Sequence, residues 1–388
     1  MHVGLVLTGG GARAAYQVGA LRALAEICPG QRSPFRVFAG VSAGAINAVS
    51  IASGADEFQV AAARLADIWR NLSPERVYRT DARGLVGIGS RWIKDLSAGG
   101  LLGSSRINYL LDTSPLRDLL AETLPLSRLS LHFRTGTLRG VAVSTTSYHD
   151  GLAVTFFDGS REVEPWQRST RIGVRQRLRL QHILASAAIP IFFPPVRIRG
   201  LYYGDGCVRM HAPLSPAIHL GSDRILAIGV QTTHADRRTH RASAPHREWL
   251  PPSEIAGVLM NAVFLDALEA DVERLERVNR TVSLLPPEQR GTASQPLRTI
   301  PILVLRPSLD LGTLAADQYL RFPRMLRYLL KGIGATGETG SDLLSYLAFE
   351  PDYVGRLMDL GYADTLRRRA AVEAFLEGSA EARADLAR

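Results

Sequence analysis

The chain has 388 residues, of which 46% are hydrophobic and 21% charged, so it is long enough for two or three domains with a sizeable core and is not expected to be disordered. Its only cysteines are Cys28 and Cys207, which excludes a disulfide framework and favours a reducing compartment. The formal net charge of +9 favours anionic partners, although it comes almost wholly from arginine, a bias that genome base composition also produces.

The chain opens with a predicted buried strand over residues 2–7. The strand runs directly into a glycine-rich loop, Thr8-Gly9-Gly10-Gly11-Ala12-Arg13. From Ala14 to Ile27 apolar residues recur at helical spacing, and Pro29-Gly30 ends that helix. The sequence therefore predicts a strand, a glycine loop and a helix at its start.

Two uses of the glycine loop follow from its residues. The loop fits the dinucleotide pattern Gly-x-Gly-x-x-Ala, but that pattern needs a carboxylate for the ribose at the end of the next strand. None occurs between Ile27 and Asp56. The alternative is an oxyanion hole, in which Gly9, Gly10 and Gly11 expose backbone N–H groups toward charge that develops on an attacked carbonyl.

The next segment carries the pattern Gly-x-Ser-x-Gly, with Ser42 at its centre. A short apolar strand over 35–39 precedes it, and a small apolar helix over 43–51 follows. A serine on a sharp strand-to-helix turn exposes its hydroxyl, and the positive end of the helix points at it. We interpret Ser42 as a candidate nucleophile; the alternative is a tight turn with a capping serine.

Four further segments have a predicted structure. Residues 56–72 form an amphipathic helix. The glycine-rich, irregular residues 73–105 are either a mobile flap over an apolar groove or a long surface excursion. Residues 139–145 and 152–157 form strands joined by a hairpin turn. The arginine-rich residues 161–179 are either a lipid head-group contact or a solvated face.

The nucleophile needs a base, and no histidine lies on a recognisable triad pattern. The candidates weighed are His132, His149, His182 and His211, and no histidine follows His246. Instead, a strand over 201–205 ends in Asp205, followed by Gly206. Burial beside Tyr203, Ile191 and Phe193 would raise the pKa of this carboxyl, so that Asp205 could take the Ser42 proton directly and later activate water.

With the glycine loop, the serine motif and Asp205-Gly206 in this order, the chain resembles the patatin-like phospholipases. Ala185-Ser186-x-x-Ile189-Pro190 and Phe193-Pro194-Pro195 are similar to the family's stretch before its aspartate. The resemblance covers about residues 3–230. It implies a Ser42–Asp205 dyad, an oxyanion hole from Gly9, Gly10 and Gly11, and a role for Arg13 in supporting that loop or meeting phosphate. It implies no metal and no cofactor.

Two positions depart from the family pattern. Ala14 replaces the glycine that usually follows the arginine, and a methyl group there is tolerated in a helix. Cys207 replaces the usual small residue after Asp-Gly, which puts the shape of the pocket and the redox sensitivity of the site in question.

The rest of the chain is predicted to be mostly helical. Residues 236–257 form a linker with three nearby histidines, and residues 258–282 form an amphipathic helix. A short strand lies over 300–305, and further helices follow from 311 onward. The basic residues 321–331 and 367–369 would dock on a membrane surface or form exposed helix faces.

No signal peptide is visible. The uncharged residues 37–55 are interpreted as protein interior and not as a transmembrane span. We therefore expect a cytoplasmic protein, with peripheral membrane contact as an option.

The sequence thus predicts a three-layer α/β/α hydrolase core over 1–235, a linker over 236–257 and a helical extension over 258–388. The expected activity is hydrolysis of carboxylic esters in lipids, of phospholipase A or lysophospholipase type, through an acyl-serine intermediate. Two alternatives stay open. One is a non-lipid carboxylesterase with the same dyad, and the other is a catalytically silent membrane-docking or regulatory protein. No nucleic-acid partner is expected, because the arginines are spread along the chain.

Overall fold

The computed structural model describes residues 1–28, 30–79, 109–232, 249–286, 290, 297–332, 334–336 and 339–378. Two predictions therefore lie partly outside the described residues. The flap or surface excursion over 73–105 is described only as far as residue 79, and the linker over 236–257 only from residue 249.

The described strands form one mixed sheet, with the order β10-β9-β1-β2-β3-β4-β6-β5 and a β7–β8 hairpin that joins β3 through β8. The strands are β1 (Val3–Leu7), β2 (Phe35–Val41), β3 (Gly140–Ser147), β4 (Ala153–Gly159), β5 (Trp166–Gln167), β6 (Arg171–Arg175), β7 (Val196–Ile198), β8 (Leu201–Asp205), β9 (Arg224–Ile228) and β10 (Ile302–Leu305).

The centre of the sheet is parallel, from β10 through β9, β1 and β2 to β3. β1, β9 and β10 are nearly continuous apolar runs, as is usual for parallel strands with helices on both faces. Leu7, the last residue of β1, pairs with Gly40 near the end of β2, so the loops that follow the two strands meet at one edge of the sheet. β8 is antiparallel to β3 and pairs Asp205 with Thr145, which brings the end of β8 toward the same place.

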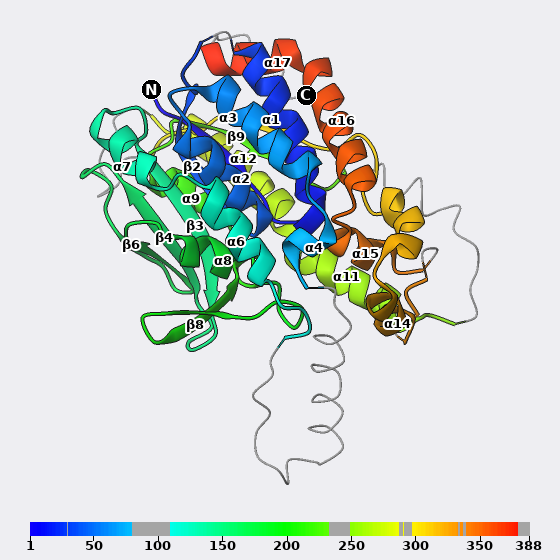
Figure 1. Ribbon diagram of the computed structural model, residues 1–388. Coiled ribbons are helices and arrows are strands. Elements are labelled where there is room, and N and C mark those ends of the chain that lie inside the picture. The colour runs from blue at the N-terminus through cyan, green and yellow to red at the C-terminus, as the bar shows by residue number, and fades with distance from the viewer. Residues whose placement is uncertain are drawn as a thin grey trace.

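Helices pack on both faces of the sheet, as Figure 1 shows. One face is covered by α1 (Ala15–Ile27), α2 (Ala43–Ser53), α3 (Phe58–Arg70) and α16 (Pro351–Arg367), whose apolar side chains share a core with Leu5 and Leu7. The other face is covered by α9 (Ser215–His219) and α12 (Asp266–Leu284), which pack with Val6 and Val37. The predicted three-layer α/β/α architecture with a helical C-terminal region is confirmed.

The remaining helices border the sheet or belong to the C-terminal region. They are α4 (Pro74–Val77), α6 (Ser114–Thr123), α7 (Ser127–Arg134), α8 (Leu180–Ser186), α11 (Pro252–Phe264), α14 (Arg324–Gly332), α15 (Ser341–Leu347) and α17 (Arg369–Glu377), with the short 3-10 helices η1 (Gly11–Ala14), η2 (Gly206–Val208) and η3 (Thr313–Arg321).

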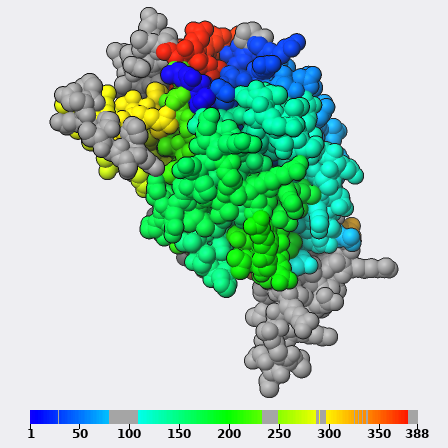
Figure 2. Space-filling model, turned by 90° about the vertical axis from the view of Figure 1, so that its left-hand side faces the viewer, coloured from blue at the N-terminus to red at the C-terminus, as the bar shows by residue number. Residues whose placement is uncertain are grey.

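The C-terminal region is built into the same body as the first 235 residues. β10 extends the sheet beside β9, and α16 lies along α1. In both views α17 (red) lies next to the N-terminal residues (blue), as Figures 1 and 2 show. The domain boundaries given above remain a prediction.

Two sequence predictions about helices and spans can be compared with this structure. The single helix predicted over 258–282 is two helices, α11 and α12, that meet at Leu265. In α12, Asp266 accepts a hydrogen bond from Gln231, and Asp271 accepts one from the backbone of Leu214. The uncharged residues 37–55 form most of β2 and the buried helix α2. Among the described residues, no helix has the length and apolar character needed to cross a membrane.

Candidate active site

Ser42 lies at the sharp turn between β2 and α2, and its backbone is strained. Its φ of 56° and ψ of −135° fall outside the regions that residues with a side chain prefer. Both glycines of the motif are needed for close approach of the backbone. A Cβ on Gly40 would lie 2.5 Å from the Cα of Ala45, and one on Gly44 would overlap the carbonyl oxygens of Leu7 and Thr8. This crowding packs α2 against the end of β1 and fixes the Ser42 side chain in the site.

Asp205, at the end of β8, accepts a hydrogen bond from the Ser42 hydroxyl. The Ser42 Oγ lies 2.6 Å from Asp205 Oδ2, although the two residues are 163 positions apart in the chain. The other oxygen, Oδ1, accepts a hydrogen bond from the backbone N–H of Cys207 at 2.9 Å. The carboxyl group is fully buried. Burial raises the pKa of Asp205 to about 7, and the hydrogen bonds from Ser42 and Cys207 oppose that rise.

A second buried serine, Ser186, holds the turn at Ser42 in place. Ser186, at the end of α8, accepts a hydrogen bond from the Ser42 backbone N–H at 2.9 Å and donates one to the carbonyl oxygen of Ser144 at 2.6 Å. On the other side, Thr146 of β3 donates to the carbonyl oxygen of Asp205 at 2.7 Å. β3 thus anchors both halves of the Ser42–Asp205 pair. No spacing in the sequence indicates these contacts.

The glycine loop between β1 and η1 lies directly over Ser42. A Cβ on Gly9 would be 2.9 Å from the Ser42 Cβ and would overlap the Cys207 sulfur. Gly10 and Gly11 adopt φ values of 156° and 56°, and the second of these favours glycine. Within the described residues, the backbone N–H groups of Gly10 and Gly11 donate to no protein acceptor. Gly11 also lines the pocket at Ser42.

A buried polar network supports the same loop from behind. Gln17 of α1 donates through Nε2 to the carbonyl oxygens of Thr8 (2.8 Å) and Ile228 (3.3 Å). Asn47 of α2 donates to the Gln17 side chain at 3.1 Å and accepts from the Trp69 indole at 2.9 Å. These contacts tie the ends of β1 and β9 to α1, α2 and α3. The loop is consequently held on a rigid support.

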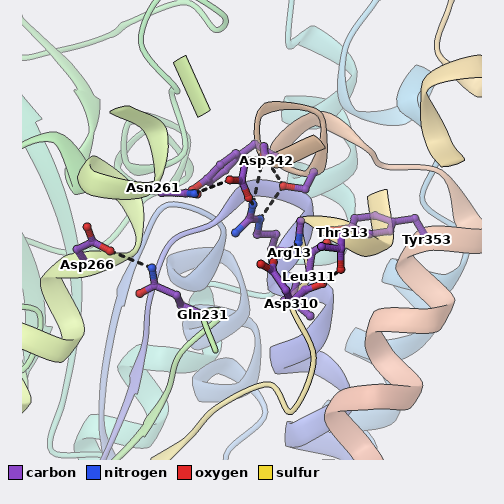
Figure 3. A network of polar contacts seen from close by, with 12 residues as sticks. Arg13, Gln231, Asn261, Asp266, Asp310, Leu311, Thr313, Asp342 and Tyr353 are labelled. Atoms are coloured by element: carbon purple, nitrogen blue, oxygen red, sulfur yellow. Dashed lines mark hydrogen bonds and ion pairs between the residues drawn. The ribbon is translucent and has the colours of Figure 1, made fainter. Parts of the chain in front are cut away.

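Arg13, which follows the glycine loop, turns its guanidinium group to the C-terminal helix α15. It donates to Asp342 and Ser345, and its side chain is 3% exposed (Figure 3). Of the two roles that the sequence left open, these contacts favour support of the loop over a contact with phosphate.

An apolar pocket opens at Ser42. Its cavity volume is about 50 Å³, and Ser42 is the only polar side chain among its lining residues. Gly11 and Ala43 lie at the serine, and Ala187 also lines the wall. The larger apolar side chains come from four helices and three loops and are Ile46, Ile68, Trp69, Leu72, Val77, Leu116, Leu119, Leu120, Ile189, Phe193 and Phe349. A lining of this kind favours an apolar group next to Ser42.

A wider, open groove of about 550 Å³ adjoins this pocket and shares Leu116, Ala187 and Phe193 with it. Its lining includes the exposed side chains of Arg117, Arg179 and Arg197. None of the three makes an ion pair with a described residue. Asp112 also lines the groove and pairs with Arg79, so the described lining carries a net positive charge next to an apolar pocket.

The histidines weighed in the sequence do not contact Ser42. His182 is buried, packs against Phe156 with tilted rings whose centroids are 4.6 Å apart, and accepts a hydrogen bond from the Arg179 backbone. Burial lowers the pKa of His182 to about 4. His132 is buried beside Ser53, and His149 and His211 are exposed.

One expectation about the Asp205 pocket is wrong. Ile191 is 61% exposed, with a φ of 70°, and does not bury the carboxyl group. Pairing of β8 with β3, together with the contact of the Asp205 backbone N–H with the Ala188 carbonyl oxygen, encloses Asp205 instead.

Cys207 is buried between Asp205 and the glycine loop. Burial raises the pKa of the Cys207 thiol well above its ordinary value, and burial raises the pKa of Cys28 to about 11. Both thiols are therefore protonated near neutral pH and poor nucleophiles. Among the described residues, no group of three or more His, Cys, Asp and Glu side chains is arranged to hold a metal ion.

Comparisons with known proteins identify a family for this chain. A family model described as patatin-like phospholipase matches residues 5–218. A search of curated proteins finds no match.

Three solved structures are similar to the chain. The human GIVD cytosolic phospholipase A2, solved with methyl gamma-linolenyl fluorophosphonate, has 15% identity and a TM-score of 0.46, over 97% of this chain and 59% of that chain. VipD from Legionella pneumophila has 13% identity and a TM-score of 0.33, over 95% and 67% of the two chains. ExoU from Pseudomonas aeruginosa, solved with SpcU, has 17% identity and a TM-score of 0.26, over 96% and 78%. This chain thus spans 59% of the length of the human protein.

Proposed function

Because the chain belongs to the patatin-like phospholipase family, a family of lipid hydrolases, we propose that it hydrolyses carboxylic esters of lipids through an acyl-serine intermediate. Ser42 is the nucleophile and Asp205 is its base. The observation that carries this proposal is the hydrogen bond of 2.6 Å from Ser42 to a buried carboxyl group, beside an apolar pocket. The chemistry is of phospholipase A or lysophospholipase type.

The reaction proceeds in two halves. Asp205 accepts the Ser42 proton as Oγ attacks the ester carbonyl, and the Gly10 and Gly11 amides, with Gly9 beside them, stabilise the negative charge on the carbonyl oxygen. The protonated Asp205 then gives its proton to the leaving alcohol, which leaves an acyl group on Ser42. In the second half Asp205 takes a proton from water, the hydroxide attacks the acyl-serine, and Ser42 recovers its proton. A carboxyl pKa of about 7 suits both directions of this transfer.

The shape and charge around Ser42 favour a phospholipid over a small non-lipid ester. The pocket at Ser42 is apolar and narrow, which suits the acyl chain, and the adjoining groove carries Arg117, Arg179 and Arg197. Guanidinium groups bind phosphate oxygens, so the anionic part of the lipid would lie in this groove. A small non-lipid ester would not need both an apolar pocket and an arginine-lined groove.

We also propose peripheral contact with an anionic lipid surface, through α11 and α14. Ile255, Val258 and Leu259 of α11 are 49%, 55% and 61% exposed. The loop after α14 contacts the start of α11, and α14 presents exposed Arg324 and Lys331. Figure 1 shows the two helices next to each other. Apolar side chains flanked by basic ones are the pattern by which proteins bind anionic bilayers without crossing them.

The test is covalent labelling combined with digestion of a lipid mixture. A fluorophosphonate probe should label Ser42, and mass spectrometry should detect free fatty acid and a lysophospholipid or its deacylated product. Ser42→Ala and Asp205→Asn should each lower turnover by at least about a thousandfold, since the nucleophile and its base act as a unit. Ser50→Ala, on the same helix α2, is the matched control and should leave turnover unchanged.

Full turnover in either Ser42→Ala or Asp205→Asn would reject the dyad. Cleavage of short-chain esters without cleavage of any phospholipid would favour the non-lipid esterase. Binding to liposomes without labelling or turnover in the wild-type protein would favour the silent docking protein.

A further inference from the structure

Arg13, which follows the glycine loop, forms polar contacts with the C-terminal helix α15. Its Nε donates to Ser345 Oγ at 2.6 Å, and its Nη2 donates to Asp342 Oδ1 at 3.0 Å and to the Asp342 carbonyl oxygen at 3.3 Å. Figure 3 shows the Arg13 side chain beside Asp342. Its carbon Cζ also lies 4.7 Å from the centre of the Tyr346 ring. A buried charge of this kind requires a partner of opposite charge, and Asp342 supplies it.

The partners of Arg13 are themselves held in place. Asp342 Oδ2 accepts a hydrogen bond from the Asn261 amide of α11 at 2.9 Å. The Tyr346 hydroxyl donates to Asn261 Oδ1 at 3.0 Å, and Ser345 donates to the Asp342 carbonyl oxygen at 2.5 Å. The acceptor side of the Arg13 contact is therefore part of a rigid network that joins α11 to α15.

The glycine loop also touches α15 directly. A Cβ on Gly11 would overlap the carbonyl oxygen of Tyr346, so α15 packs against the loop with no room for a side chain. Gly11 and Phe349, which follows α15, both line the pocket at Ser42. Two independent observations, the Arg13 ion pair and this close approach, thus put α15 against the segment that carries the free amides.

We propose that Asp342 is a positioning residue for the reaction. Through Arg13 it holds the Gly9–Gly11 loop at the distance from Ser42 at which the Gly10 and Gly11 amides stabilise the transition state. Asp342 and Ser345, the partners of Arg13, lie outside the region 5–218 that the family model matches, so in this proposal the C-terminal region completes the active site. This inference rests on the proposed function, because it needs turnover in order to be measured.

The expected effect separates kcat from KM. Amides that bind the developing oxyanion act in the transition state, so a misplaced loop lowers kcat and leaves KM nearly unchanged. A displacement on the order of 1 Å can cost about a hundredfold in rate. We expect Asp342→Asn, which keeps the size of the side chain and removes its charge, to lower kcat about tenfold to a hundredfold. Asp342→Glu should recover part of that loss.

The measurement uses the full chain, and kcat, KM and the melting temperature are determined for each variant. The rate of labelling by a fluorophosphonate is determined as well, because the tetrahedral phosphorus adduct also needs the amides. Asp271→Asn is the matched control. Asp271 is a more deeply buried carboxylate that accepts from the Leu214 backbone on the opposite face of the sheet. This control should keep kcat and the labelling rate at temperatures where it is folded, whatever its change in melting temperature.

Ser345→Ala provides a milder variant if Asp342→Asn does not fold. It removes the acceptor of Arg13 Nε and the donor to the Asp342 carbonyl oxygen but keeps the Asp342 carboxylate, and we expect a loss of several-fold in kcat. A folded Asp342→Asn or Ser345→Ala protein with wild-type kcat and labelling rate overturns the positioning role. A wild-type protein with no labelling and no turnover overturns the proposed function instead, so the two failures are distinguishable.

Discussion

At the scale of single residues, the site depends on one strained backbone and one buried carboxyl group. Ser42 is held at a positive φ by the close contacts of Gly40 and Gly44, and Asp205 is enclosed by β3 and β8. Both residues belong to short motifs and were therefore candidates from the sequence. Ser186, which holds the turn at Ser42, and Asn47, which supports the glycine loop, could not be identified as site residues from the sequence. An isolated serine or asparagine carries no periodic or spacing signal. Their roles depend on partners far away in the chain.

The titration of Asp205 should control activity near neutral pH. The carboxyl group must be ionised to accept the Ser42 proton, and burial raises its pKa to about 7. We therefore expect kcat/KM to rise with pH and to level off above a midpoint near 7, which a pH–rate profile on a soluble ester measures. The control is the same profile with His182→Gln, because His182 does not contact the dyad; a shift of the midpoint in that variant would contradict the assignment to Asp205.

The same burial should destabilise the folded protein when Asp205 ionises. Because the folded-state pKa lies above the ordinary value of 3.8, the contribution of Asp205 to stability is fully present below about pH 4 and is lost as the pH rises through 7. A rise from 3.8 to about 7 corresponds to about 4 kcal/mol in full. Asp205→Asn should consequently gain stability relative to wild type between pH 4 and pH 8, by up to about that amount. Urea unfolding at pH 4 and pH 8 measures the free energy of unfolding of Asp205→Asn relative to wild type. If that difference is the same at both pH values, the prediction is wrong.

At the scale of elements, helices α1 and α16 pack so closely that their backbones touch. A Cβ on Gly361 of α16 would overlap the carbonyl oxygen of Tyr16, and a Cβ on Gly19 of α1 would overlap that of Met358. The sequence predicts both helices from their apolar spacing. It does not indicate that residues more than 300 positions apart form one interface, because each helix buries an apolar face against whichever element the topology places there.

This contact leads to opposite effects for two glycines on the same helix. Gly361→Ala should destabilise the protein by about 1–3 kcal/mol, since the methyl group meets backbone that cannot move away cheaply. Gly355→Ala should stabilise it by about 0.5–1 kcal/mol, because nothing lies within 4 Å of a Cβ at that position and alanine has the higher helix propensity. Thermal or urea unfolding of the two variants is the measurement. A loss of similar size in both would mean that α16 does not pack on α1 in this register.

At the scale of the whole molecule, the chain has a net charge of +9. Some of its basic side chains form contacts within the protein, and others are exposed. The basic residues 367–369, weighed in the sequence as a membrane contact, are engaged within the protein. Arg367 pairs with Asp364, Arg368 donates to the Val304 carbonyl oxygen, and Arg369 pairs with Glu26. The exposed basic side chains of α14 are the better candidate for an anionic surface.

Binding to vesicles tests that surface. We expect the protein to bind vesicles that contain anionic phospholipid, to bind less as salt rises, and to bind zwitterionic vesicles weakly, because the basic side chains of α14 act through screened electrostatics. Leu259→Asp should reduce binding severalfold, whereas Val60→Asp, at a position 52% exposed on α3, should not. Cosedimentation with vesicles measures both. An equal loss in the two variants would contradict a surface formed by α11 and α14.

The sequence by itself determined the order of the elements, the parallel start of the sheet, and the candidates Ser42, Asp205 and the three glycines. These features are local: an apolar period, a turn motif or a glycine run is encoded within a few neighbouring residues. Only the tertiary structure decided what surrounds them. Antiparallel pairing of β8 with β3 brings Asp205 to Ser42, and α15 reaches back to Arg13 across 329 positions of the chain. Such contacts depend on the chain topology and on close packing between distant segments. A sequence pattern that spans a few residues does not encode them.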